Sequence, residues 1–168
     1  ARHCVGDRHH RQRARSRMSG RLIVVTGTGT NIGKTHLACS LARRWGAKGA
    51  RVAGIKPIES GSEGPFGPDS LALAAHSTFH VKHPPPYVLR APLAPARAAD
   101  EEEIEVDIER VLNWVNAVRS EAEGVIVELP GGLFSPVRPG WTNAELLIAL
   151  KPDATVLVAA NRLGVLHD

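Results

Sequence analysis

The sequence is short of cysteines, aromatic residues and long apolar runs, and each shortage excludes a class of protein. Its two cysteines, Cys4 and Cys39, are too few for a disulfide framework, and no CxxC pair indicates a zinc site. Aromatic residues make up 4% of the chain, and we interpret its three tryptophans as packing residues and not as a base-stacking platform. The longest apolar runs, such as residues 154–160, are far shorter than the ~20 residues that span a bilayer. We therefore expect a cytoplasmic protein with no membrane partner.

Positive charge is concentrated at one end of the chain. The 168 residues include 21 Lys and Arg against 17 Asp and Glu, which gives a formal net charge of +4. Residues 1–20 hold six arginines and one aspartate, so their net charge is +5 and the remainder carries −1. A nearly neutral body argues against a general nucleic-acid binder, and no nucleic-acid partner is expected.

The basic segment of residues 1–20 has almost no side chains that could pack, and it lacks the apolar stretch of a secretory signal. We expect it to be a disordered tail. A phosphate-binding arm and an arginine-rich transit peptide are the alternatives. Met18 is the single methionine and stands just before the first expected strand, so we expect the natural start at Met18.

The rest of the chain alternates between strand and helix patterns. Short β-branched runs predict strands at residues 22–25, 51–55, 125–129 and 155–160. Apolar residues at helical spacing predict helices at residues 35–45, 69–75, 108–118 and 142–150, with Asp107 and Thr142 as N-caps. Residues 83–98 are expected to form an extended connection, and the acidic run at 100–105 a solvated loop leading into the next helix. This alternation predicts one α/β domain over residues 21–168, with a mainly parallel sheet and helices on both faces.

A glycine-rich loop between the first strand and the first helix is typical of a phosphate-binding P-loop. Its glycines let several backbone N–H groups point at one anion, and the following helix adds its positive N-terminal end. The side chain of Lys34 can reach the β- and γ-phosphates, and the Thr35 hydroxyl can bind Mg2+. The spacing is a variant, because Thr28 stands where the strict pattern has its first glycine; a glycine-rich turn without a ligand is the alternative. The residues expected to bind the nucleotide are Gly27, Thr28, Gly29, Thr30, Asn31, Ile32, Gly33, Lys34 and Thr35.

Polar residues also follow the other expected strands, at the edge where parallel sheets bind ligands. Lys56 follows the second strand and could neutralise a transferring phosphoryl group. Asp69 and Glu128 could hold Mg2+, which prefers carboxylates and water. The alternatives are a surface lysine for Lys56, a helix N-cap for Asp69 and a solvated loop acid for Glu128. The apolar strand before Glu128 favours burial beside a partner, because a buried carboxylate without one is costly.

Six segments of the chain resemble dethiobiotin synthetase in order and spacing. They read G-T-G-T-N-I-G-K-T, I-K-P-I-E-S-G, P-D-S-L-A-L, P-Y-V-L-R-A-P-L-A-P, V-E-L-P-G-G-L-F-S-P-V and N-R-L-G. The resemblance extends from about residue 21 to residue 168 and implies a P-loop NTPase-like fold. It implies an ATP- and Mg2+-dependent ligase of biotin biosynthesis that converts 7,8-diaminopelargonate, CO2 and ATP to dethiobiotin, ADP and phosphate. One amine of the diamine forms a carbamate, ATP phosphorylates it, and the second amine closes the cyclic urea.

The same resemblance implies a role for each matching residue. Lys34, Lys56 and Thr30 would be catalytic, with Lys34 on the phosphates and Lys56 on the carbamate and the γ-phosphate. Thr35, Asp69 and Glu128 would form the Mg2+ site. The family is dimeric, and the substrate carboxylate lies at a helix start contributed by the partner subunit. The substrate-contacting residues would be Lys56, Ser60, Gly131, Gly164, Val165 and Leu166.

The chain departs from the family pattern at a few positions. Members usually carry Asp where Gly29 stands, often Glu where Asn31 stands, and Gly-Ala where Leu129 and Pro130 follow Glu128. Members also continue well beyond the N-R-L-G segment, so we expect a domain that lacks its C-terminal part. Two further hypotheses stay open, a nucleotide-switch ATPase of the partitioning or cell-division type and a non-catalytic remnant. The absence of a second lysine at positions 27–32 argues against the switch.

Overall fold

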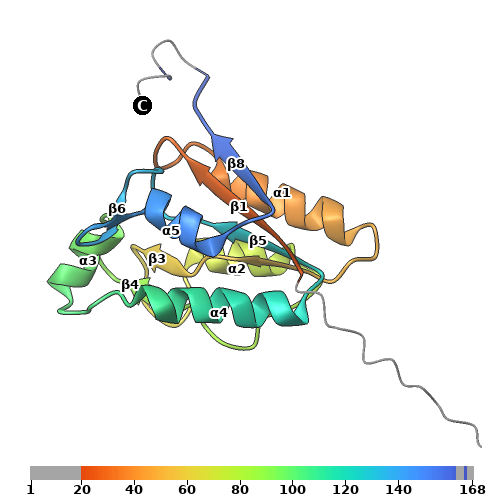
Figure 1. Cartoon of the computed structure of the whole chain (residues 1–168), viewed down its shortest axis with the longest axis horizontal. Coiled ribbons are helices and arrows are strands. Elements are labelled where there is room, and N and C mark those ends of the chain that lie inside the picture. The colour runs from red at the N-terminus through yellow and green to blue at the C-terminus, as the bar shows by residue number, and fades with distance from the viewer. Residues whose placement is uncertain (1–19, 162–164, 166–168) are drawn as a thin grey trace, which may run out of the picture.

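A computed structural model describes residues 20–161 and residue 165, and its centre is a parallel sheet (Figure 1). Four strands form this sheet in the order β2–β5–β1–β8, and every neighbouring pair is parallel. The predicted parallel α/β architecture is therefore confirmed. The predictions for residues 1–19, Gly164 and Leu166 concern positions outside the described residues. The strands are β1 (Arg21–Gly27), β2 (Val52–Ile55), β5 (Gly124–Glu128) and β8 (Ala154–Val158).

Helices cover both faces of the sheet, as the sequence predicts. The helices α1 (Lys34–Gly46) and α2 (Pro68–Ala75) pack on one face, and α4 (Ile108–Glu121) and α5 (Asn143–Leu150) pack on the other. Along β5 the side chains alternate, since Ile126 joins the α1–α2 side while Val125 and Val127 join the α4–α5 side. None of the helices in the described part of the chain is long and apolar enough to cross a membrane.

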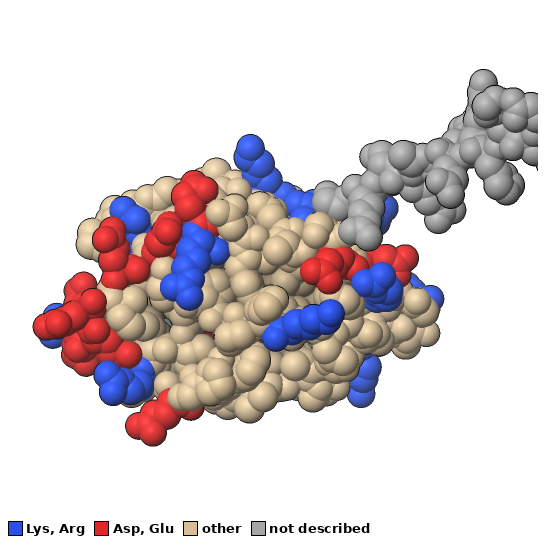
Figure 2. All heavy atoms as spheres, turned by 90° about the horizontal axis from the view of Figure 1, so that it is seen from below, with Lys and Arg blue, Asp and Glu red and all other residues tan. Residues whose placement is uncertain are grey.

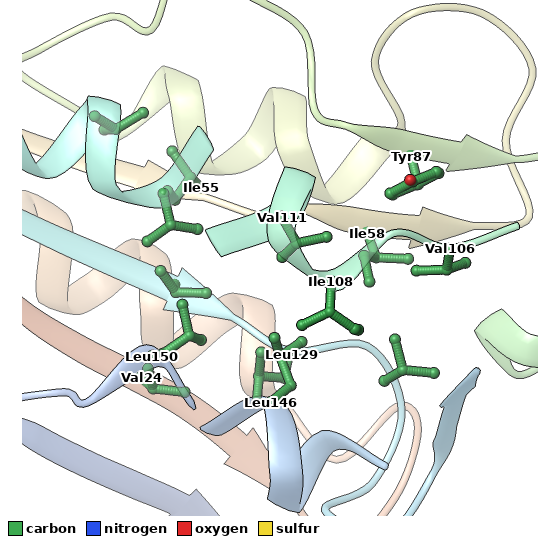
Figure 3. Close-up of a cluster of buried hydrophobic side chains, with 14 of the residues drawn as sticks. Val24, Ile55, Ile58, Tyr87, Val106, Ile108, Val111, Leu129, Leu146 and Leu150 are labelled. Atoms are coloured by element: carbon green, nitrogen blue, oxygen red, sulfur yellow. The ribbon is translucent and has the colours of Figure 1, made fainter. Parts of the chain in front are cut away.

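The larger hydrophobic core lies between the sheet and the α4–α5 layer (Figure 3). Helix α4 contributes a stripe of buried residues at helical spacing, which explains why its sequence pattern is clear. The predicted N-caps of these two helices are confirmed. The Asp107 side chain accepts from the Glu109 N–H at 2.8 Å, and Thr142 forms a capping box with Glu145. The labelled core residues are Val24, Ile55, Ile58, Tyr87, Val106, Ile108, Val111, Leu129, Leu146 and Leu150.

Some short elements are absent from the sequence-based prediction. Strand β3 (Ile58–Ser60) pairs in parallel with β4 (Tyr87–Leu89), and β6 (Pro136–Arg138) pairs antiparallel with β7 (Trp141–Thr142). The expected extended connection over 83–98 is wrong beyond residue 94, because α3 (Pro95–Glu101) begins there with proline in its first turn.

The acidic run at residues 100–105 differs in part from the expected solvated loop. Its first two residues belong to α3, and the Glu102 carboxylate accepts from the Arg90 N–H at 2.5 Å. The remaining acids of the run are exposed. Figure 2 shows acidic side chains gathered, with a few basic ones, toward the end of the molecule where α3 lies. This run is therefore a solvated surface with one local structural contact.

The start of β8 is fastened to β1 by Asp153. Its carboxylate accepts from the Leu22 N–H at 2.6 Å and from Arg119 Nη2 at 2.8 Å. The hydrogen bond from Leu22, with a smaller contribution from the charge of Arg119, lowers the pKa of Asp153. A lowered pKa in the folded state means that the charged carboxylate stabilises the fold at neutral pH.

Asp153→Asn should destabilise the protein modestly. We expect the free energy of unfolding at pH 7 to fall on the order of 1 kcal/mol, because the lost charged hydrogen bond is partly screened by solvent. The difference in unfolding free energy between variant and wild type should reach its full size above the unfolded pKa of about 3.9. It should disappear as the pH falls through the lowered pKa of the folded state. Urea denaturation at several pH values measures it, with the exposed acid Glu63→Gln as the matched control. A loss that is the same at every pH would contradict the assignment.

Candidate functional site

The glycine-rich loop lies between the end of β1 and the start of α1, where a P-loop is expected. Gly33 is the N-cap of α1 and has a φ of 97°, and Asn31 has a φ of 58°, so the loop turns through left-handed backbone at two positions. A Cβ on Gly27 would lie 2.8 Å from the Val158 carbonyl oxygen and 3.2 Å from Lys34 Cδ, which explains why glycine stands there. A Cβ on Gly29 would meet nothing within 4 Å. Packing therefore does not require glycine at this position, where family members usually carry Asp.

Lys34 is the first residue of α1 and is buried beneath the loop. Its side chain turns back, and Nζ donates to the Gly29 carbonyl at 2.6 Å. Burial lowers the pKa of Lys34, and the charge of Glu128 only partly opposes this effect. The ammonium group therefore lies inside the loop, where it could form an ion pair with a bound anion.

Lys56, Asp69, Glu128 and Thr35 form one connected cluster. Lys56 Nζ lies 2.5 Å from Asp69 Oδ2 and 2.9 Å from Glu128 Oε1, and Thr35 Oγ1 donates to the same Glu128 oxygen at 3.0 Å. Lys56 is 7% exposed and Glu128 is 1% exposed, so the surface-lysine and loop-acid alternatives are wrong. Asp69 is not an N-cap either, because Gly67 is the N-cap of α2 and Asp69 lies in its first turn.

Sheet register explains why residues so distant in sequence meet. Strand β5 lies between β1 and β2, and Glu128 at its end pairs with Val25 of β1. Ile55 pairs with Val127, so Lys56 leaves β2 beside Glu128. Because all three strands run parallel, their carboxyl ends deliver the P-loop, the lysine and the glutamate to one edge.

The buried charges shift one another's protonation. Burial by itself would lower the pKa of Lys56, but the charges and hydrogen bonds of Glu128 and Asp69 outweigh it, so the pKa is raised and the lysine is held as a cation. Burial raises the pKa of Glu128, and its contact with Lys56 offsets part of that rise. With Lys34, the cluster contains two lysines and two carboxylates, of which Lys34, Lys56 and Glu128 are buried and the Asp69 side chain is 38% exposed.

A cavity of about 500 Å3 opens beside the loop, which is a volume typical of small-molecule sites. Thr30 of the P-loop and Val165 of the same chain both line it. Ser60 and Gly131 do not line it, although the neighbour of Gly131 does. The Ser60 hydroxyl is buried and has no hydrogen-bond partner among the described residues. The cavity is lined by Gly27, Thr28, Gly29, Thr30, Gly132, Leu133, Phe134, Ser135, Leu157, Ala159 and Val165.

Asn143 is a site residue that the sequence analysis missed. It is fully buried at the start of α5, and its Nδ2 donates to the Pro130 carbonyl at 2.5 Å and to the Gly132 carbonyl at 2.8 Å. The same loop is tied to the P-loop by a hydrogen bond of 2.7 Å from the Leu133 N–H to the Gly27 carbonyl. Pro130 therefore contributes its carbonyl oxygen to this contact, which does not use the N–H that proline lacks. A polar residue directly after a helix cap was the only sequence signal for Asn143.

Comparison with known proteins is consistent with this geometry. Residues 21–168 match the family described as AAA domain. The ATP-dependent dethiobiotin synthetase BioD of Nitrosospira multiformis is 38% identical over 150 residues, which are 88% of this chain and 66% of the relative. The synthetases of the same name from Anaeromyxobacter dehalogenans and Xanthomonas axonopodis pv. citri are 37% and 39% identical, over 86% and 85% of this chain.

The chain spans 66% of the length of each of these three relatives. The matched region contains the P-loop, the lysine after β2 and the carboxylates at α2 and β5, which are the groups that meet in the structure. The chain therefore belongs to the AAA domain family, and the three relatives named above are called ATP-dependent dethiobiotin synthetases.

Proposed function

We propose that the protein is an ATP- and Mg2+-dependent ligase that closes the cyclic urea of dethiobiotin from 7,8-diaminopelargonate and CO2. The observation that carries this proposal is the convergence of Lys34, Lys56, Asp69 and Glu128 at the carboxyl edge of one parallel sheet. The names of the relatives supply the substrate class, and they favour a ligase over a nucleotide switch.

The P-loop residues Gly27–Thr35 would bind the triphosphate. Backbone N–H groups of the loop and the N-terminal end of α1 favour negative charge, and Lys34 adds a cation that burial has stripped of water. The lowered pKa of Lys34 fits a lysine whose full partner is an anion brought by the ligand.

The oxygen ligands present fit Mg2+. Thr35, Asp69 and Glu128 offer one hydroxyl and two carboxylates, which is the donor set of a hard cation. The Glu128 Oε2 atom is buried and has no hydrogen-bond partner among the described residues, so it can accept a further ligand. When bound, Mg2+ supplies positive charge against the phosphate oxygens.

Lys56 would act on the reacting groups of the substrate. An amine of the diamine adds to CO2 and releases a proton to give a carbamate, and a carbamate oxygen then attacks the γ-phosphorus while ADP leaves. The second amine attacks the carbamate carbon and loses a proton, phosphate leaves, and the ring closes. Lys56, held as a cation by its two carboxylates, would stabilise the negative charge that develops on the carbamate and the transferring phosphoryl group. Thr30 and Ser60 would contact the carbamate end of the substrate, and Gly131 would be a further substrate contact.

The remaining expectations concern assembly and location. We propose a cytoplasmic homodimer in which the substrate carboxylate is bound near Gly164, Val165 and Leu166 of the partner subunit. Of the matching residues in this chain, Val165 is described, and it borders the cavity beside the chain's own P-loop. Analytical ultracentrifugation would test the dimer.

The proposed activity is tested by incubating the purified protein with 7,8-diaminopelargonate, ATP, Mg2+ and labelled bicarbonate. We expect labelled dethiobiotin and equimolar ADP, with no product when the diamine or ATP is left out. Tight ATP binding without labelled dethiobiotin would contradict the ligase. ATP-dependent dimerisation that ignores the diamine would instead support the nucleotide switch.

A further inference from the structure

A third carboxylate, Glu59 in β3, lies behind the proposed metal site. It is 2% exposed and accepts three hydrogen bonds from the start of α2. The Asp69 N–H donates to its Oε1 at 2.7 Å, and the Ser70 N–H and Ser70 Oγ donate to its Oε2 at 3.1 and 2.5 Å. A residue from a neighbouring strand thus satisfies N–H groups that the helix itself leaves free.

No ion pair involving Glu59 occurs among the described residues. Its negative charge is met by the N–H groups of Asp69 and Ser70 and by the positive end of α2. Because a buried carboxylate is costly unless such bonds are kept, Glu59 and the first turn of α2 must stay together. The contact therefore fixes where α2 begins.

The contact between Glu59 and α2 also affects the position of the Asp69 side chain. Its backbone N–H is held by Glu59 while its carboxylate contacts Lys56, which in turn contacts Glu128. Gly67 gives independent support, because a Cβ there would collide with the Glu59 carboxyl group. Its φ of −88° is open to any residue, so close approach to Glu59 is the reason for glycine.

We infer that Glu59 is a positioning residue that holds Asp69 in place for the divalent cation accompanying the nucleotide. The inference rests on the proposed function, in which Asp69 is a ligand of Mg2+. Glu59 itself is not among the residues proposed to contact the nucleotide or the substrate. Its effect should therefore appear in the part of ATP binding that depends on Mg2+, and not in the part that depends on the P-loop.

The test compares ATP affinity in Mg2+ with ATP affinity in EDTA by isothermal titration calorimetry. Two variants disturb the contact in different ways: Glu59→Gln replaces an acceptor with an N–H2 group, and Gly67→Ala pushes on an unchanged carboxylate. In both we expect the enhancement of affinity by Mg2+ to fall about tenfold, the size of one lost charged hydrogen bond, while affinity in EDTA stays within about twofold of wild type. The exposed Glu63→Gln is the matched control and should behave as wild type.

Circular dichroism first establishes that the variants fold. Ser70→Ala removes one of the three hydrogen bonds and no charge, and it is the variant to use if the other two unfold; we expect it to reduce the enhancement about twofold to threefold. Full Mg2+ enhancement in the folded variants would overturn the inference alone. Equal ATP affinity in Mg2+ and EDTA for the wild-type protein would overturn the proposed function, and the inference with it.

Discussion

Lys34→Met should reduce turnover by about 10²–10³-fold and should not destabilise the fold. The loss follows because Lys34 is the cation inside the P-loop, and removing one preorganised charge from a site of this kind has an effect of that size. Stability should persist because burial lowers the pKa of Lys34, which means that the folded protein already disfavours its charge. Methionine keeps the apolar stem while removing that charge. Steady-state kinetics measure turnover, binding of a fluorescent ATP analogue measures nucleotide affinity, and urea denaturation measures stability.

The matched control for this variant is Lys82→Met, which changes an exposed lysine to the same residue. It should leave turnover, nucleotide affinity and stability unchanged. A Lys34→Met protein that binds the nucleotide as tightly as wild type would exclude Lys34 as the phosphate-binding lysine.

Lys56→Met should lose both activity and stability. Turnover should fall by about 10²–10³-fold, because the proposed charge stabilisation at the carbamate is removed. Unlike Lys34, Lys56 is the partner of Glu128, which is 1% exposed, so its removal leaves a buried carboxylate without its cation. Breaking such a pair typically costs about 3 kcal/mol of unfolding free energy. Kinetics and urea denaturation at pH 7 measure the two effects.

The double variant Lys56→Met/Glu128→Gln separates these two effects. It removes both members of the pair, so we expect most of the lost stability to return while activity stays low. If the double variant were as unstable as Lys56→Met, the cost would lie in packing and not in the buried charge. Stability of Lys56→Met equal to wild type would contradict the ion pair itself.

The sequence predicts the parts of the site that lie at the ends of strong strand patterns. Strands β1, β2 and β5 are almost wholly buried, so they read as short apolar runs whose ends are easy to locate. Parallel pairing then brings those ends together, which is why the meeting of Lys34, Lys56 and Glu128 could be anticipated.

The sequence does not predict contacts that depend on the path of the chain between these strands. Strands β3 and β4 have three residues each, too few for a period to emerge, yet their pairing places Glu59 against α2. Asn143 looks like an ordinary first residue of a helix, and only the return of the loop after β5 makes it a loop anchor. In both cases the hydrogen-bond partners lie at least ten residues away in the chain, so the local sequence does not reveal the contact.

The central place of β5 restricts how this protein can vary in length. Each strand residue advances the chain by about 3.3 Å and alternates faces, so deleting one residue of β5 would retract the Glu128 carboxylate and turn it toward the opposite layer. Two neighbouring strands would have to shorten together to compensate. Insertions and deletions in related proteins should therefore accumulate in surface connections such as residues 61–66, whereas the strands that end at the site keep their lengths.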